Sequence, residues 1–354
     1  MGVDVGLARL SNDLIVGGIA AYSVAFLGYA IDAAFGNHVP AVATETAAAI
    51  DVRQPALVGV TAHDANQSRG ADWTSSASGP RTPGVRLART NAAARGVGGF
   101  LSARTGQFAV AVTVVGWLLH LGAVVTRGLS VHRLPWGNMY EFTLAFTLTV
   151  VTAFLVIMMR QPARYLGVFV MTPVVLALGV AVLVLYVAPA PLVPALHSFW
   201  LAIHVTAAII ASGVFTVATA ATFMFLIADR YAVAMASGKP VRFSALARIM
   251  PAPEVLDRTA YRAYAFAFPV WTFAVIAGAI WAEYAWGHYW QWDPKETWAF
   301  ITWVIYAGYL HARATAGWRG RKAAYVAMLG FTSIIFNFFI VNIFITGMHS
   351  YAGV

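Results

Sequence analysis

The segment Trp286-Gly-His-Tyr-Trp-Gln-Trp-Asp-Pro-Lys-Glu-Thr-Trp298 lies between two long apolar runs and holds four of the chain's 12 tryptophans. Its part Asp293-Pro-Lys-Glu296 has an N-cap candidate, a proline at the first helical position and a glutamate at the third, so we predict that a helix begins here. If the part before it is also helical, Trp286 and Trp290 share a face. Crowded indoles suit either a flat apolar ligand or the aromatic belt that many membrane proteins carry at the interface.

The composition of the whole chain excludes an ordinary soluble domain. Of its 354 residues, 60% are hydrophobic and only 10% are charged, whereas a soluble domain has about 25% charged residues. The chain has no cysteine, which excludes disulfides, thiolate metal sites and a dithiol redox role. The net charge of +9 comes from basic residues between apolar runs, so membrane topology explains it better than nucleic-acid binding.

The apolar runs predict an all-α integral membrane protein with about eight transmembrane helices. Each run is close to or longer than the roughly 20 residues that cross a bilayer. The predicted spans are 14–35, 107–127, 139–159, 165–187, 197–228, 264–286, 298–317 and 323–347. We expect three regions in the chain: an N-terminal transmembrane helix (1–35), a polar and flexible cytoplasmic loop (36–105), and a membrane domain (106–354) that contains segment 286–298.

The distribution of basic residues predicts the orientation. If the N-terminus is outside, 19 of the 23 lysines and arginines lie in inner segments and four in outer segments. Cytoplasmic loops of membrane proteins carry such an excess. We therefore expect both termini and segment 286–298 on the extracytoplasmic side.

Three histidines are candidate ligands because of their predicted depth. His204 lies near the outer end of the fifth span and His349 follows the last span, so both lie in the same layer as segment 286–298. His311 lies in the inner half of the seventh span. A lone histidine in an apolar helix is often structural, yet ionisable residues inside a membrane are functional candidates by default. Two histidines beside an aromatic surface suit a haem, because each imidazole fills one axial position.

These residues resemble a known family. Segment 286–298 resembles the tryptophan-rich "WWD" signature of haem-handling membrane proteins, and its continuation to Trp303 resembles the CcsA/ResC family of the cytochrome c biogenesis system II, also named CcsB in some bacteria. Further motifs follow in the order of that family, and together they cover about residues 107–354. They are Leu134-Pro-Trp-Gly-Asn-Met-Tyr-Glu141, Trp200–Val205, Tyr309-Leu-His-Ala-Arg313 and Gly347-Met-His-Ser-Tyr351.

The resemblance assigns roles to individual residues. It implies that His204 and His349 are axial ligands of haem b at the outer face. It implies that His311 belongs to an intramembrane haem site, whose opposing ligand comes from a separate ResB-type membrane subunit. The other residues that it places in contact with the haem are Trp286, Trp290, Trp292, Asp293 and Trp298.

The resemblance also implies a function in the plasma membrane. Haem would be presented at the outer face for thioether attachment to an apocytochrome c with a Cys-x-x-Cys-His segment, whose thiols other proteins of the pathway keep reduced. We expect synthase activity only together with the ResB-type subunit. No residue here has the features of a conventional catalytic acid or base, and Asp293 and Glu296 are explained as helix caps. The N–H groups of the helix that they cap are candidates to attract the haem propionates.

The sequence also leaves alternatives open. The loop 36–105 is longer than the family pattern, and His288 replaces a residue that is usually small and polar. Other histidines without an assigned role are His120, His132 and His197. A solute or ion transporter could use intramembrane histidines, although we see no broken helices or paired repeats. A respiratory b-type haem subunit would place both ligands on facing helices, whereas His349 lies beyond the last span.

Overall fold

The computed structural model describes residues 3–35, 84–192, 196–238 and 250–349, with side chains from residue 104 onward in the second range. All regular elements in these ranges are helices, as predicted. Of the predicted loop 36–105, the part from 36 to 83 lies outside the described residues. Residues 84–105 belong to a helix, so this end of the loop differs from the prediction.

Within the described ranges, eight long helices form the bundle, and most of them are longer than the spans predicted for them. They are α1 (Val5–Phe35), α3 (Gly84–Ser130), α4 (Met139–Arg160), α5 (Gly167–Leu183), α6 (Phe199–Ala236), α8 (Pro253–Trp286), α9 (Pro294–Ala314) and α10 (Arg321–Ile335). A 3-10 turn, Arg164–Leu166, precedes α5. The last helix continues as a π-helix, Phe336–Val341, and ends in α11, Asn342–Phe344.

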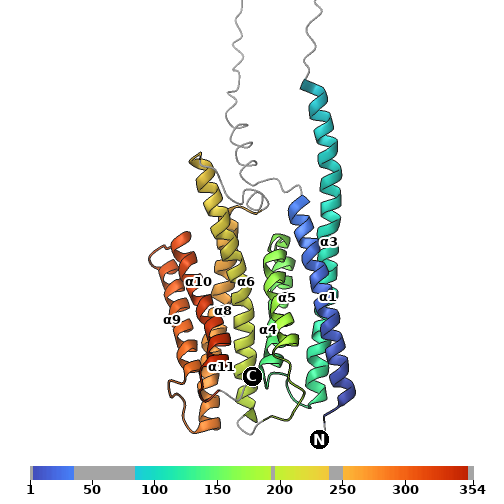
Figure 1. Ribbon diagram of the computed structural model, residues 1–354. Coiled ribbons are helices and arrows are strands. Elements are labelled where there is room, and N and C mark those ends of the chain that lie inside the picture. Colours follow the sequence, from blue (N-terminus) through green and yellow to red (C-terminus); the bar gives the residue numbers. More distant parts are fainter. Residues whose placement is uncertain (1–2, 36–83, 193–195, 239–249, 350–354) are drawn as a thin grey trace, which may run out of the picture.

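Seven helical segments of the described part are long and apolar enough to cross a membrane. They agree with seven of the predicted spans. The eighth, α9, is a helix of 21 residues that is not among the seven, because its ends are polar and its middle is rich in Trp and Tyr. In Figure 1, α9 runs beside α10 through the same layer. The chain is therefore an all-α membrane protein.

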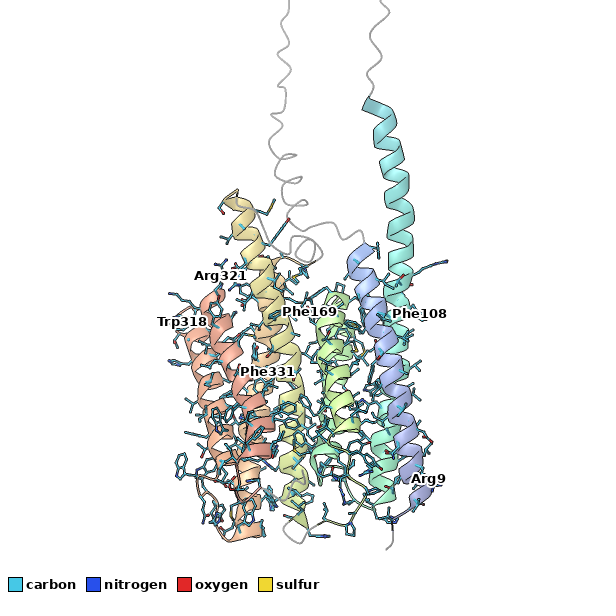
Figure 2. All side chains as sticks on the ribbon, viewed as in Figure 1. Arg9, Phe108, Phe169, Trp318, Arg321 and Phe331 are labelled. Atoms are coloured by element: carbon cyan, nitrogen blue, oxygen red, sulfur yellow. The ribbon has the colours of Figure 1, made fainter. Side chains whose placement is uncertain are left out.

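The order of the helices brings distant segments to one end of the bundle. Helix α1 packs along α3 and α6 along α8, while α4 and α5 lie between these pairs, and α9 and α10 complete the bundle (Figure 1). The start of α1, the α8–α9 connection and the end of α11 point to the same end. Figure 2 shows Arg9 near that end and Arg321 near the opposite one. Segment 286–298 and the described ends of the chain thus lie at the same end of the bundle, as predicted. That this end faces the extracytoplasmic side of the membrane stays a prediction.

Aromatic rings fill the centre of the bundle where α6, α8 and α9 meet. Phe215 stacks on Tyr306 with ring centroids 4.1 Å apart and an interplanar angle of 7°. Tyr264 lies 5.3 Å from Tyr306, and Trp271 lies 6.2 Å from Phe215. Many large apolar side chains point outward instead, as expected for a surface in contact with lipid (Figure 2).

Candidate functional site

A cavity of about 500 Å³ opens in the end of the bundle where the α8–α9 connection lies. This volume is within the usual range for small-molecule sites. Its wall is mainly apolar and aromatic. Residues that line it include Trp136, Phe142, Leu201, His204, Trp271, Trp281, Trp286, Trp290, Lys295, Asn337 and His349. The structure thus brings two of the three candidate histidines and two of the candidate tryptophans to one cavity.

His204 reaches the cavity from the second turn of α6, whose N-cap Ser198 accepts a hydrogen bond from Trp200 N–H at 3.2 Å. The His204 Nδ1–H donates to the carbonyl oxygen of Ala274 in α8 at 2.8 Å. Because a carbonyl only accepts, this bond fixes the proton on Nδ1 and leaves the lone pair on Nε2. The imidazole also stacks on Trp281, with centroids 5.9 Å apart and an angle of 13°. His204 therefore presents Nε2 as a ligand in a fixed direction.

Gly278 makes the position of His204 possible. A Cβ atom on Gly278 would lie 2.6 Å from both Cε1 and Nδ1 of the imidazole, which is closer than side chains tolerate. Glycine at this position of α8 lets the ring approach the helix backbone and reach Ala274.

His349 reaches the same cavity from the segment that follows α11. Its Nδ1–H donates to Oδ2 of the buried Asp293 at 2.8 Å, which again assigns the lone pair to Nε2. Asp293 also accepts from the backbone N–H of Met348 at 2.6 Å and of Lys295 at 3.1 Å. A carboxylate that holds the second nitrogen of a histidine orients it and makes it a better metal ligand. Asp293 thus both caps α9 and orients His349.

The charge states of this pair suit a ligand. Burial alone would raise the pKa of Asp293, but the hydrogen bonds from His349 and from backbone N–H groups outweigh it and hold the pKa below its ordinary value. Burial lowers the pKa of His349, and the nearby charge of Lys295 acts in the same direction, against the hydrogen bond to Asp293. At neutral pH the carboxyl is therefore charged and the imidazole neutral, which is the form that binds metals.

The predicted helix start is confirmed. Helix α9 begins at Pro294 with a complete capping box, in which Asp293 accepts from the N–H groups of Lys295 and Glu296. Oε2 of Glu296 accepts from the N–H groups of Gln291 at 2.9 Å and Asp293 at 3.2 Å. These side chains satisfy the N–H groups at the helix start, so the expectation that those groups attract a ligand does not hold.

The tryptophans of segment 286–298 divide into two groups. Trp286 and Trp290 line the cavity, and Trp286 contacts His349 edge to face at 4.9 Å. Trp292 and Trp298 are not among the described residues of its wall. Trp292 is 64% exposed, and the Trp298 ring packs against Phe336 at an angle of 30°, with ring centroids 4.0 Å apart. The condition for Trp286 and Trp290 to share a helical face is not met, because α8 ends at Trp286 and α9 begins at Pro294.

The other histidines lie away from the cavity wall in the part of the chain that the structure describes. His311 is exposed on the surface of α9. His120 is buried, with Nδ1 3.3 Å from the hydroxyl of Tyr22. His197 and His132 lie in connecting segments, and His288 stacks beside Trp286 at 6.3 Å. The structure therefore separates His311 from His204 and His349, and the depth of His311 in the membrane stays a prediction.

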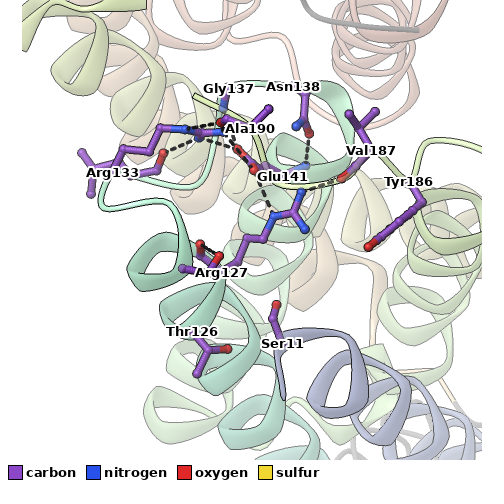
Figure 3. A network of polar contacts seen from close by, with 12 residues as sticks. Ser11, Thr126, Arg127, Arg133, Gly137, Asn138, Glu141, Tyr186, Val187 and Ala190 are labelled. Atoms are coloured by element: carbon purple, nitrogen blue, oxygen red, sulfur yellow. Dashed lines mark hydrogen bonds and ion pairs between the residues drawn. The ribbon is translucent and has the colours of Figure 1, made fainter. Parts of the chain in front are cut away.

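A buried ion cluster supports one wall of the cavity (Figure 3). Glu141 accepts from Arg127 Nε at 3.0 Å, from Arg133 Nη1 at 2.7 Å and from Gly137 N–H at 2.9 Å. Arg127 Nη2 in turn donates to the carbonyl of Val187 at 2.6 Å. The cluster ties the end of α3 and the segment after α5 to the start of α4. Trp136, Gly137 and Asn138, in the loop that it holds, form part of the cavity wall.

Sequence reasoning missed several of these residues. Trp281 is buried between the two imidazoles, which it contacts at 5.9 and 5.7 Å, but it lies outside segment 286–298. Gly278 and Lys295 were given no role at the site either. Trp281 and Gly278 are three residues apart, a spacing that places both on one face of α8. Nothing in the sequence showed that this face of α8 meets His204.

Comparison with known proteins gives the family. Residues 136–349 match the family described as "Cytochrome C assembly protein". The chain belongs to this family. The matched region begins at Trp136 and ends at His349, both in the cavity wall, so family membership covers the whole site.

Individual relatives agree with the match. The "Cytochrome c biogenesis protein CcsA" of Trieres chinensis is 36% identical over 241 residues, which cover 61% of this chain and 77% of the relative. The protein of the same description from Gloeobacter violaceus is 35% identical over 298 residues, which cover 70% of this chain and 85% of the relative. That of Guillardia theta is 41% identical over 171 residues, 46% of this chain and 57% of the relative.

Proposed function

We propose that this chain is the haem-handling membrane subunit of a system II cytochrome c synthase, and that haem b is its substrate. The observation that carries the proposal is the pair His204 and His349. Each imidazole has its Nδ1–H held by an acceptor, and both line one apolar, indole-rich cavity. Two neutral imidazoles and flat aromatic surfaces are what a six-coordinate haem requires of a protein.

In this proposal the protein orients haem and shields it. His204 and His349 hold the iron from the two faces of the macrocycle, while Trp281, Trp286 and Trp290 cover porphyrin surface and exclude water. Thioether bonds then form between the reduced thiols of the apocytochrome and the haem vinyl groups. The apocytochrome's own histidine replaces one of the two imidazoles, which releases the product. The reactivity belongs to the haem, and the protein supplies position and environment.

His311 supports a separate, intermolecular site. It is exposed on α9 rather than turned into the bundle, so a second ligand would come from another polypeptide. A ResB-type membrane subunit is the expected source. Segment 286–298 would face the extracytoplasmic side of the plasma membrane, where the apocytochrome arrives, and the thiol-reducing proteins of the pathway would act on that same side.

The absorption spectrum of the detergent-purified chain, with and without the ResB-type subunit, tests the proposal. We expect a six-coordinate haem spectrum that His204→Ala or His349→Ala abolishes. The matched control is His197→Ala, in an exposed loop outside the cavity wall, which should leave the spectrum unchanged. An unchanged spectrum in both ligand variants would refute the assignment. Absence of haem from the wild type would favour a transporter, and haem that cannot pass to an apocytochrome would favour a respiratory subunit.

A further inference from the structure

Lys295 is a cation in the wall of an apolar cavity. It is the second residue of α9, is half-buried, and lines the cavity together with His204 and His349. Among the described residues, no side chain pairs with its ammonium group. The nearby carboxylates of Asp293 and Glu296 are engaged by His349 and by backbone N–H groups. A partly buried cation without a direct ion pair is unfavourable, so the cavity favours a ligand that brings a further anionic group.

Trp290 provides a second donor without a partner. Its indole Nε1 is buried, and within the described part of the chain it has no acceptor. A buried donor left in this way is unfavourable, because it has given up its hydrogen bond to water without a replacement. Trp290 lines the same cavity as Lys295. An ammonium group and an indole N–H together suit a carboxylate, which accepts hydrogen bonds and donates none when ionised.

We propose that Lys295 and Trp290 bind a propionate carboxylate of the haem and thereby fix which edge of the macrocycle enters the cavity. This inference rests on the proposed function. The propionates and the vinyl groups occupy opposite edges of haem b. A propionate held at Lys295 therefore turns the vinyl edge away from α9. Lys295 and Trp290 act as positioning residues for the attachment, in addition to the two histidines that hold the iron.

Binding of haem and of haem dimethyl ester, in which both propionates are esterified, tests the proposal on the full-length chain in detergent. We expect the wild type to bind haem more tightly than the ester. Lys295→Met should weaken haem binding by roughly tenfold or more, the usual effect of losing a hydrogen bond to a charged group, and leave ester binding unchanged. Lys295→Arg should keep the preference, and Trp290→Phe should reduce it. Lys322→Met, an exposed lysine at the other end of the bundle, is the matched control for the loss of one charge.

The outcomes separate this proposal from the one on which it rests. If Lys295→Met and Trp290→Phe keep the wild-type preference for haem over its ester, the propionate site is refuted, while a haem spectrum that depends on His204 still supports the proposed function. If the wild type shows no haem spectrum that depends on histidine, both proposals fail. If Lys295→Met does not fold, Lys295→Arg and Trp290→Phe still test the site. Loss of the preference for haem over its ester in Lys295→Arg would count against the site. An unchanged preference in Trp290→Phe would also count against it.

Discussion

At the residue scale, the site depends on atoms that hold the imidazoles rather than on the imidazoles alone. The His204 ring is held by the carbonyl of Ala274 and has room to reach it because Gly278 has no side chain. The His349 ring is held by the carboxylate of Asp293. Such partners usually change metal affinity by about 10- to 100-fold when they are removed. These partners fix the tautomer of each imidazole and the direction in which its Nε2 points. Two histidines in a flexible chain would have neither fixed.

Gly278→Ala should therefore weaken haem binding by about 10- to 100-fold without harm to the helix, since alanine is the better helix former. The added methyl group would displace the His204 ring from Ala274. Titration of the purified protein with haem measures the effect. Gly179→Ala in α5, where a Cβ meets nothing within 4 Å, is the control. Wild-type affinity in Gly278→Ala would mean that the ring does not need this approach.

The ionisation of the Asp293–His349 pair predicts a pH profile. Because burial holds the pKa of His349 below its ordinary 6.5, haem affinity should be retained at pH 6.5 and above and fall only at lower pH. Asp293, with a lowered pKa, stabilises the fold above its ordinary 3.8 and loses that contribution as the pH falls through its lowered value. Haem titrations at several pH values test this. If haem affinity has already fallen by half at pH 6.5, His349 would behave as an ordinary, exposed imidazole instead.

At the scale of elements, the Glu141 cluster joins α3, α4 and the segment after α5. Both Glu141 and Arg127 are fully buried, and Arg127 Nη1 has no hydrogen-bond partner among the described residues. A buried ion pair adds little to stability by itself, but loss of one partner leaves an uncompensated charge. The cluster thus fixes the loop that carries Trp136.

We expect Glu141→Ala to destabilise the protein by about 3–5 kcal/mol, the usual cost of breaking a buried pair. Thermal unfolding in detergent measures this. Asp229→Ala is a matched control, because the Asp229–Arg321 pair lies at the other end of the bundle and is partly exposed. That variant should lose about 1 kcal/mol or less. Equal effects of the two variants would contradict a structural role for the cluster.

At the scale of the whole molecule, the bundle has two ends with different tasks. One end carries the cavity, the α8–α9 connection and few of the described basic side chains, and the other carries Arg321 and most of the basic side chains that the structure describes. His311 is exposed in the last turn of α9, away from the end that carries the cavity. The cavity and most of the described basic side chains thus lie toward opposite ends of the bundle.

The lack of cysteine makes the orientation testable. Single cysteines at His197, beside the start of α6, and at Ala316, after α9, occupy exposed positions at opposite ends of the bundle. From the excess of basic residues on the inner segments, a membrane-impermeant maleimide added to intact cells should label His197→Cys and not Ala316→Cys. The reverse pattern would invert the topology and place the cavity on the cytoplasmic side. Permeabilised cells, where both should react, control for accessibility.

The sequence by itself determined the class of the protein, the places of its helices and the capped start of α9. These follow from hydropathy, length and local capping, which act over a few neighbouring residues. It also determined that His204 and His349 lie in one layer, because helical rise converts sequence position into depth. Resemblance, rather than periodicity, connected these residues to haem.

Only the tertiary structure decided which side chains face the cavity. Rotation of a helix about its axis and the path of a loop depend on packing between elements far apart in sequence. Trp292 and Trp298 thus lie in the predicted segment but outside the described wall, whereas Trp281 belongs to it. The same packing brings Asp293 to His349 across 56 residues of chain. Local sequence determines depth and helix ends, while contacts between helices determine direction, and a ligand site requires both.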